Sequence, residues 1–405
     1  FIDMRRGALR FVRAKAVLMA TGGGPTMYRY HTPSGDKSMD GLAMALRFGL
    51  PLRDMEMVQF HPTGLLAGRD TRMTGTVLEE GLRGAGGHLL DGDGRRFLFD
   101  YDAHGERATR DVVSRAMYAE MRAGHATPNG GVYLSMAHLR ADAVAAQFPG
   151  MVKRCADCGF DLVHGRVEVV PTAHYFMGGV VCDADTATEM PGLFVAGEDA
   201  GGVHGANRLG GNGVANSTVF GGICGERMAR YVAAESSAGG FADDVDAEWV
   251  GAEIAAALRP LHARDDSPVA RLHELRDELM DIMWRDVGVL RDDHGLRRAL
   301  GELDALRDET MRLGVASERA FNLSWQDWLN LRNLTDISDV IARAALARCN
   351  SRGAHFREDF RDAGDLAKSC FTVSRRCADG VEVTQQPVAF TLVRPGMSLL
   401  DESPP

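Results

Sequence analysis

Histidine and arginine side chains are found in five separate segments of this 405-residue chain, and four of these segments also contain glycine. Such side chains bind carboxylates, because a guanidinium pairs with a carboxylate through two hydrogen bonds and an imidazole adds a donor whose charge depends on pH. The segments are His61–Gly64, Glu80–Gly84, Arg110–Arg115, His174–Gly179 and His204–Asn212. If the fold brings them together, they form a pocket for a small molecule with two carboxylates, and we predict such a pocket.

The overall composition sets the background for that pocket. The formal net charge is -10 at pH 7, and apolar residues make up 45% of the chain. We therefore expect a folded protein with a sizeable core and no nucleic-acid partner, since a nucleic-acid binder would have a basic face. An anionic ligand must be attracted by local cations against the field of the whole protein. The sequence has no apolar run near the ~20 residues of a membrane-spanning helix and no secretory signal pattern.

The cysteines do not indicate a metal site. Their number, seven, is odd, which favours a reducing compartment over a disulfide framework. Cys155 and Cys158 form the one CxxC pair in the sequence, without a second pair or a histidine tandem to complete a zinc site. We interpret them as two incidental thiols and predict no metal ligands.

Glycine turns that follow apolar strands are expected to position the pocket. Residues 11–20 have the pattern of a buried strand that ends at Thr21-Gly22-Gly23, and residues 191–198 have the pattern of a second strand that ends in a glycine turn. Asp40 stands near the start of a predicted helix, where it could cap that helix or hold a ribose hydroxyl. The predicted helices cover residues 38–49, 110–124 and 212–232.

Changes in composition and apolar periodicity along the chain predict a multidomain α/β and α+β fold. We expect a Rossmann-type domain, residues 1–57 and 172–240, that is interrupted by an α+β capping domain, residues 58–171. Apolar residues at helical spacing predict a helical domain over residues 241–350. The polar remainder, residues 351–405, alternates at 381–384 and 388–393, which predicts short strands. No strand with a GxGxxG turn precedes residue 11, so the Rossmann-type domain is expected to be incomplete at its N-terminal side.

Four motifs, taken together in their order and spacing, resemble the flavoprotein subunit of the succinate dehydrogenase/fumarate reductase family. They are Gln59-Phe-His-Pro-Thr63, Arg110-Asp-Val-Val113, His174-Tyr-Phe-Met-Gly-Gly179 and His204-Gly-Ala-Asn-Arg-Leu-Gly-Gly-Asn212. The resemblance extends over nearly the whole chain, from Ala20-Thr21-Gly22-Gly23 to Ser351-Arg-Gly-Ala-His-Phe-Arg-Glu358. It implies FAD in the Rossmann-type domain and a capping domain that closes over a dicarboxylate.

The resemblance also implies roles for single residues. His61, His174 and Arg208 would bind the substrate carboxylates. Arg110 would transfer a proton beside the substrate double bond, reloaded through Glu80 and Arg83. A helix that begins at Asn212 would place its positive end at the flavin and stabilise the reduced form. The implied FAD-binding residues are Thr21, Gly22, Gly23, Asp40, Gly41, Glu198, Asn212, Gly213 and Val214.

The activity implied by the resemblance is the interconversion of succinate and fumarate by hydride transfer to or from FAD. Electrons would pass to an iron–sulfur subunit, then to a quinone. That subunit must be a separate chain, because this one has no cysteine pattern for clusters. A membrane anchor subunit would hold the complex on the cytoplasmic side of the inner membrane. Two alternatives stay open: a flavoenzyme similar to L-aspartate oxidase, and a truncated fragment without catalytic activity.

Three departures from the family pattern bear on these expectations. Glu79 stands where the family usually has a threonine that contacts substrate, and a carboxylate there would repel a dianion unless it points away. Gly213-Val214-Ala215 replaces the usual Ser-Leu-Leu. The N-terminal dinucleotide fingerprint and the histidine that many members link to FAD are not in the sequence. We therefore expect either that the chain is partial or that another segment supplies that half of the FAD site.

Overall fold

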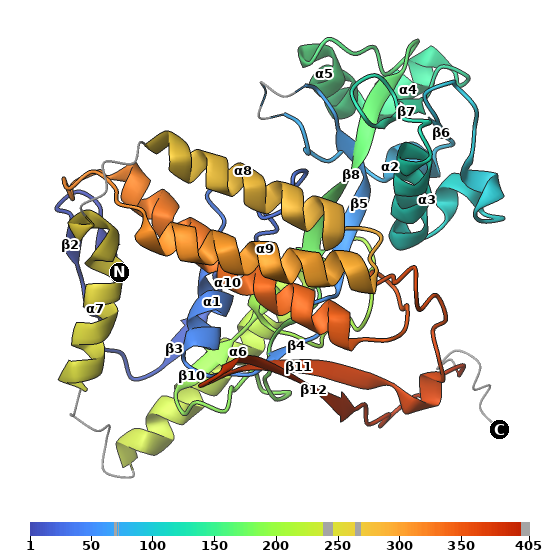
Figure 1. Cartoon of the computed structure of the whole chain (residues 1–405). Helices are drawn as coiled ribbons and strands as arrows, with labels where there is room; N and C mark the ends of the chain where they lie inside the picture. Colours follow the sequence, from blue (N-terminus) through green and yellow to red (C-terminus); the bar gives the residue numbers. More distant parts are fainter. Residues whose placement is uncertain (69–70, 72, 238–245, 264–268, 398–405) are drawn as a thin grey trace, which may run out of the picture.

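The computed structural model describes residues 1–68, 71, 73–237, 246–263 and 269–397. Within these residues the chain is a mixed α/β and α+β protein of several parts, as predicted (Figure 1). None of the described helices is long and apolar enough to cross a membrane.

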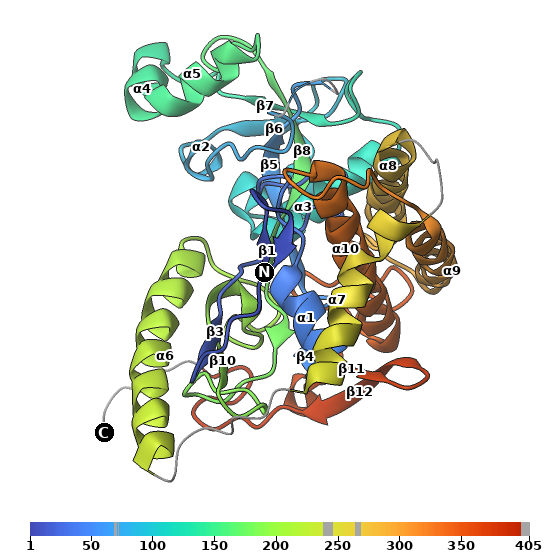
Figure 2. The ribbon, with the colours of Figure 1, turned by 90° about the vertical axis from the view of Figure 1, so that its left-hand side faces the viewer.

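The part around the predicted FAD site is built on a parallel strand pair. Strand β3 (Val17–Met19) pairs with β10 (Leu193–Val195), although the whole capping segment lies between them in sequence. The predicted strand over residues 11–20 was therefore too long: Phe11 and Val12 are exposed, and three residues form the strand. Helix α1 (Asp40–Arg47) and helix α6 (Asn212–Ser237) match their predicted positions closely. Helix α6 stands at one side of the molecule (Figure 2).

The capping part has its own antiparallel sheet and its own core. The strand order is β5-β8-β7-β6. Strands β5 and β8 are long and almost wholly buried, and they run from this part into the rest of the molecule (Figure 1). The elements are β5 (Val58–Leu65), β6 (His88–Leu90), β7 (Val132–Ser135), β8 (Val167–Phe176), α2 (Gly81–Gly84), η1 (Leu98–Asp100), η2 (Gly105–Arg107), α3 (Arg110–Arg122), α4 (Ala141–Gln147) and α5 (Pro149–Asp157). Most of their apolar side chains form a hydrophobic cluster of their own, whereas Phe60, Tyr118 and Phe176 belong to the larger core.

The larger core joins the FAD-site part to a set of long helices. Side chains of α1 pack with those of α8, α9 and α10. Helices α7, α9 and α10 begin at side-chain caps: Asp246, Asp292 and Asn322 each accept the backbone N–H three residues later, at 2.7–2.9 Å. The bounds are α7 (Ala247–His262), α8 (Val269–Asp286), α9 (Asp293–Arg312) and α10 (Leu323–Ala347).

The C-terminal residues extend a sheet of the FAD-site part. Strand β11 (Cys370–Cys377) pairs antiparallel with β12 (Gly380–Pro387) on one side and with β4 (Leu52–Arg53) on the other, and β4 pairs with β9 (Gly179–Val180). The alternation at 381–384 lies within β12, but residues 388–393 form no strand, so that prediction was wrong. A short hairpin, β1 (Ile2–Asp3) with β2 (Ala8–Leu9), and the turn η4 (Leu366–Lys368) complete the described elements.

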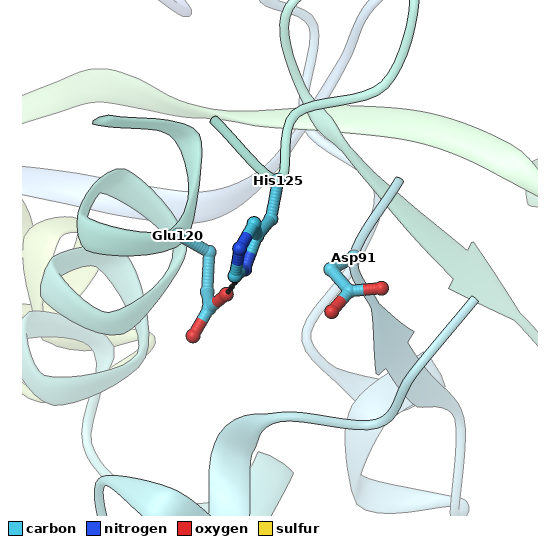
Figure 3. A group of neighbouring side chains, drawn as sticks. All are labelled: Asp91, Glu120 and His125. Carbon is cyan, nitrogen blue, oxygen red and sulfur yellow. Dashed lines mark hydrogen bonds and ion pairs between the residues drawn. The ribbon is translucent and has the colours of Figure 1, made fainter. Parts of the chain in front are cut away.

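One group of metal-type side chains is found among the described residues, and an arginine already bridges its two carboxylates. Asp91, Glu120 and His125 lie together in the capping part (Figure 3). The Arg95 guanidinium donates to Asp91 from Nε and to Glu120 from Nη2, both at 3.1 Å. His125 Nδ1 lies 2.7 Å from Glu120 Oε2. Because the arginine already bridges both carboxylates, we interpret the cluster as an ion-pair network that joins the loop after β6 to α3.

A buried ionic network connects three parts of the chain that are distant in sequence. Arg348, just after α10, donates to Glu56 Oε1 at 2.5 Å and to Asp54 Oδ1 at 3.0 Å. From β11, the Thr372 N–H donates to Asp54 and its hydroxyl donates to Glu56. Burial and the charge of Glu56 raise the pKa of Asp54 to about 7, against the opposing effect of Arg348. Asp54 also has a left-handed backbone, φ 50°, which asparagine tolerates as well as aspartate.

We predict that Asp54→Asn reduces the loss of stability as pH rises. The folded protein binds a proton at Asp54 up to about pH 7, whereas the unfolded chain releases it near its ordinary pKa. The contribution of Asp54 is therefore fully present at low pH and is lost between about pH 4 and 7, by at most about 1.4 kcal/mol per pH unit. Urea unfolding of both proteins at pH 5 and pH 8 measures this difference. An equal pH dependence for the two proteins would contradict the assignment.

Candidate active site

Arg110 and Arg208 lie close together although they come from different parts of the fold. Arg110 is the first residue of α3, and Arg208 lies in the loop before α6. Arg110 Nη1 and Arg208 Nη2 each donate to the same atom, Gln59 Oε1, at 3.1 Å. The structure thus places these two predicted site residues within reach of a single oxygen.

Glu80 joins Arg110 to Arg83. Its Oε1 accepts from Arg83 Nη2 at 2.9 Å, and its Oε2 accepts from Arg110 Nη2 at 2.8 Å and Nε at 3.2 Å. Partial burial would raise the pKa of Glu80, but the hydrogen bonds and charges of Arg110 and Arg83 outweigh it and lower the pKa. The carboxylate is therefore ionised at neutral pH. Since Arg110 has five N–H donors, two of them, one on each Nη, are left for a ligand.

His61 and His174 lie on the adjacent strands β5 and β8, with ring centroids 5.5 Å apart. The Thr63 N–H donates to His61 Nδ1 at 3.3 Å, which leaves the proton of neutral His61 on Nε2. Thr32 Oγ1 lies 2.9 Å from His174 Nδ1. Burial and the charge of nearby arginines lower both pKa values, that of His61 well below its ordinary value and that of His174 to about 4. Both imidazoles are therefore neutral at pH 7.

Arg208 retains unused hydrogen-bond donors in a buried position. It is 6% exposed, and its Nε has no hydrogen-bond partner within the part of the chain that the structure describes. Its guanidinium carbon lies 4.3 Å from the ring centroid of Tyr175. Burial and the neighbouring charge of Arg110 lower the pKa of Arg208. A buried cation with a free donor is stabilised by an anion, and a carboxylate matches its planar geometry.

The charges of the site match a ligand with two negative charges. Arg83, Arg110 and Arg208 are cations and Glu80 is an anion, so two positive charges remain when the histidines are neutral. Glu79 does not disturb this balance, because its side chain is exposed and forms no described ion pair with these arginines. From the sequence, Glu79 either points away from the ligand or indicates a different substrate, and its exposed position is compatible with the first alternative.

The Thr21–Gly23 turn after β3 is held by Asp199, in η3 (Gly197–Asp199). Asp199 accepts the N–H of Thr21, the Thr21 hydroxyl at 3.0 Å and the N–H of Gly22 at 3.1 Å. Burial raises the pKa of Asp199 to about 6. A Cβ at Gly23 would lie 2.0 Å from Glu198 Oε1, and one at Gly41 would lie 2.5 Å from the Thr21 hydroxyl, so a side chain at either position would displace a group that borders this turn.

The remaining predicted cofactor residues lie in η3, at the start of α1 and at the start of α6. Glu198 accepts the Phe176 N–H at 2.9 Å, and burial raises its pKa to about 7. Asp40 does not cap α1, because Met39 is the cap residue; Asp40 instead accepts from Asn333 at 2.7 Å. At the start of α6, Asn212 and Val214 are exposed, and Gly213 lies against Tyr175 and Arg208.

These residues fit a dinucleotide. A Cβ at Gly22 or Gly211 would meet no atom within 4 Å, so a ligand can approach the backbone closely at both turns. The N-terminus of α6 is the positive end of the helix dipole and therefore favours an anion. The buried Asn216 Oδ1 has no hydrogen-bond partner within the described residues.

Comparison with known proteins agrees with this arrangement. Residues 2–214 match the FAD binding domain family, and residues 276–399 match the family described as the fumarate reductase flavoprotein C-terminal region. The fumarate reductase flavoprotein subunit of Mycobacterium tuberculosis is 35% identical over 412 residues, which cover 98% of this chain and 70% of that protein. The chain belongs to the fumarate reductase/succinate dehydrogenase flavoprotein family. FAD is therefore its cofactor.

Other members of the family are similar over much of this flavoprotein. One subunit of the CoM/CoB fumarate reductase of Methanothermobacter marburgensis is 39% identical over 364 residues, 90% of this chain and 64% of the relative. An L-aspartate oxidase of Synechocystis is 32% identical over 365 residues, 86% and 63% of the two chains. A structure of E. coli quinol fumarate reductase superposes with a TM-score of 0.88 at 33% identity, over 98% of this chain and 69% of that one. The flavoprotein described here thus spans a little under two thirds of several curated relatives.

Several residues that support the site were not singled out from the sequence. Gln59 stands within one of the four motifs, but its bonds to both arginines depend on the fold. Asp199 directly follows Glu198, and a second acidic residue after a strand-ending glycine was the one available signal. Tyr175 and Asn207 were likewise part of motifs, without a predicted role.

We predict that Asp199→Ala lowers the retention of FAD by this flavoprotein at least tenfold. The substitution removes the acceptor of three hydrogen bonds that shape the Thr21–Gly23 turn. Flavin absorbance per protein, measured after gel filtration of the full-length protein, reports the effect. Asp157→Ala, at an exposed ion pair in the capping part, is the matched control and should leave flavin content unchanged. Full flavin content in Asp199→Ala would show that the turn does not depend on this carboxylate.

Proposed function

We propose that this chain is the catalytic flavoprotein of an enzyme that interconverts fumarate and succinate. The observation that carries the proposal is the shared position of Arg110 and Arg208, two cations with unused donors beside two neutral histidines. Two uncompensated positive charges suit a four-carbon dicarboxylate, whose two ends each need a cationic or N–H donor. FAD, when bound, supplies the hydride chemistry.

In this proposal the chain binds and orients the two carboxylates. Arg208 contributes its free Nε and the free protons of its Nη atoms to one carboxylate. His61 Nε2–H and His174 contribute further donors, because their Nδ1 atoms are already in contact with threonines. Thr21, Gly22, Gly23, Asp40, Gly41, Glu198, Asn212, Gly213 and Val214 are the proposed contacts to FAD.

The proton is held and delivered by arginine. An Nη of Arg110 donates the proton to the substrate carbon during fumarate reduction. Glu80, whose Oε2 lies 2.8 Å from Arg110 Nη2, is ionised, so it takes up a proton from Arg83 before it returns one to Arg110. Arg83, bonded to Glu80 Oε1, is the next residue of the relay. Arginine's pKa exceeds ~12, so it suits an acceptor that is a very strong base, such as a carbon next to a carboxylate. Glu80 keeps the neutral state of the guanidine short-lived.

The electron partners are proposed from the family. Similar proteins are named as quinol fumarate reductases and as a CoM/CoB fumarate reductase, so the electron donor differs between relatives. The immediate partner in this proposal is an iron–sulfur subunit, with a quinone beyond it. A membrane anchor subunit would then place this chain at the cytoplasmic side of the inner membrane, as a peripheral protein.

A second candidate is an oxidase of L-aspartate. The similarity to the Synechocystis L-aspartate oxidase favours it, because that protein is nearly as similar in sequence as the fumarate reductases. The deciding experiment offers the full-length protein fumarate with a reduced viologen dye, succinate with an oxidised dye, and L-aspartate with oxygen. Fumarate or succinate turnover supports the first proposal, and turnover of aspartate alone replaces it with the second. A purified protein without a flavin absorption band would favour a non-catalytic fragment.

We predict that Arg110→Lys lowers kcat for fumarate reduction by more than the ~10²–10⁴-fold typical of a lost general acid. Lysine cannot keep both hydrogen bonds to Glu80 Oε2 and the one to Gln59, so the proton donor is misplaced as well as changed. Stopped-flow or dye-coupled assays measure kcat, with flavin content as the check on folding. Arg107→Lys, an exposed position in η2, is the matched control. Turnover near that of the natural protein, with normal flavin content, would exclude Arg110 as the proton donor.

We also predict that dicarboxylate binding takes up protons and weakens as pH rises from 5.5 to 7.5. The pKa of His174 is about 4 before binding because of burial and the charge of Arg208, and a dianion beside the ring raises it by favouring the imidazolium. Calorimetry with malonate in two buffers of different ionisation enthalpy gives the proton number at pH 6. His174→Gln should reduce that number. Tight malonate binding without proton uptake would show that the histidines stay neutral in the complex.

A further inference from the structure

Every hydrogen-bonding position of the Gln59 carboxamide is used. The side chain is 1% exposed. Its Oε1 accepts from Arg110 and from Arg208, both at 3.1 Å. Its Nε2 donates to Asn207 Oδ1 at 2.7 Å and to the Arg208 carbonyl at 2.6 Å. An amide has two acceptor and two donor positions, so Gln59 has none left for a substrate.

The partners of Gln59 also fix which way its amide faces. A flipped amide would point its N–H groups at two guanidinium donors and its oxygen at two acceptor oxygens, and all four contacts would be lost. A glutamate would keep the contacts to the arginines, but its second oxygen would face Asn207 Oδ1 and the Arg208 carbonyl without a proton to donate. A glutamine is therefore the side chain that satisfies both sides.

A further chain of contacts anchors Gln59 and the loop that carries Arg208. Asn207 Nδ2 donates to Asp111 Oδ1 at 2.9 Å, and Asp111 Oδ2 accepts from Arg115 at 2.9 Å. Arg115 also donates to the carbonyl of Gly353 at 2.9 Å. Residue 354 in turn donates its N–H to the carbonyl of Ala206, two residues before Arg208. The amide thus belongs to a network that reaches from α3 to the residues after α10.

A neutral acceptor is the suitable link between two cations that must remain available. Arg110 already gives two hydrogen bonds to the anionic Glu80, whereas no carboxylate ion-pairs with Arg208 in the described residues. A carboxylate at position 59 would cancel one of the two positive charges that a dianion needs. An amide dipole holds both guanidiniums without doing so.

We propose that Gln59 is a positioning residue that sets the spacing of Arg110 and Arg208, and thereby aligns the proton donor with the carboxylate clamp. The proposal rests on the proposed function for its catalytic consequence, but not for the geometry itself. Gln59 acts through the two arginines and does not touch substrate, because its polar atoms are already paired.

The first test replaces Gln59 by methionine, which has a similar length and no strong hydrogen-bonding group. A crystal structure of the full-length Gln59→Met holoenzyme should show the guanidinium groups of Arg110 and Arg208 farther apart, or each in more than one conformation. We expect kcat for fumarate to fall at least tenfold and malonate, followed by the change in flavin absorbance, to bind at least tenfold more weakly. Gln386→Met, the same substitution on exposed β12, is the control and should change neither.

A double-mutant cycle separates positioning from a general loss of stability. If Gln59 acts through Arg208, Gln59→Met weakens malonate binding less than twofold in an Arg208→Lys background, in contrast to the tenfold effect in the natural protein. A structural defect at position 59 would instead give the same factor in both backgrounds. Equal factors would therefore overturn the proposal.

Gln59→Glu is the second variant, and it keeps a link between the arginines. We expect its guanidiniums to stay together while malonate binds at least tenfold more weakly, because one positive charge is cancelled. Guanidiniums that keep their natural positions in Gln59→Met would refute the positioning role. A natural protein that neither turns over fumarate nor binds malonate would refute the proposed function instead, and displaced guanidiniums in Gln59→Met would still support the role of Gln59 in the geometry.

Discussion

The structure holds the guanidinium groups of Arg110 and Arg208 close together in its interior without pairing each of them with a carboxylate of the described residues. The rest of the site depends on this arrangement. Two unit charges 4 Å apart repel each other by about 4 kcal/mol at an effective dielectric constant of 20. Arg110 and Arg208 are kept near each other by a shared neutral acceptor, by Glu80 on one side and by the ring of Tyr175 on the other. The repulsion that remains is available to be relieved by an anion. Part of the binding energy for an anion, such as the proposed dicarboxylate, is thus present before the ligand arrives.

The cations come from two separately packed regions. Glu80, Arg83 and Arg110 belong to the capping part, which has its own hydrophobic cluster, whereas Arg208 follows η3 in the FAD-site part. Strands β5 and β8 run through both regions and carry the two histidines (Figure 1). Because the strands are almost wholly buried, they fix the distance between the regions. The relative positions of the cations therefore depend on the packing of these two strands.

The sequence predicted the residues whose chemistry is local and missed those whose role depends on distant partners. Glycines near His174 and Arg208 and the charged motif at Arg110 marked the site, and the predicted helices over 110–124 and 212–232 begin where α3 and α6 begin. The strand over residues 11–20 was overestimated, because strand pairing with β10 is long-range and ends after three residues. Residues 388–393 alternate like a strand, but the partner of β12 is β11, at 370–377. The use of Gln59 and the low pKa values of the histidines follow from burial beside arginines, which no local pattern reveals.

The residues after α10 support the site although none of the proposed substrate-binding residues lies among them. The carbonyl of Gly353 accepts from Arg115, a Cβ at that glycine would lie 2.3 Å from the Ala206 carbonyl oxygen, and the next residue bonds to the same carbonyl. Truncation at the end of α10 would leave every proposed substrate contact in the chain and yet release the loop that presents Arg208. The segment after α10 therefore supports the loop that carries Arg208. A shortened chain would lose the position of Arg208 although the deleted residues contain no proposed substrate contact.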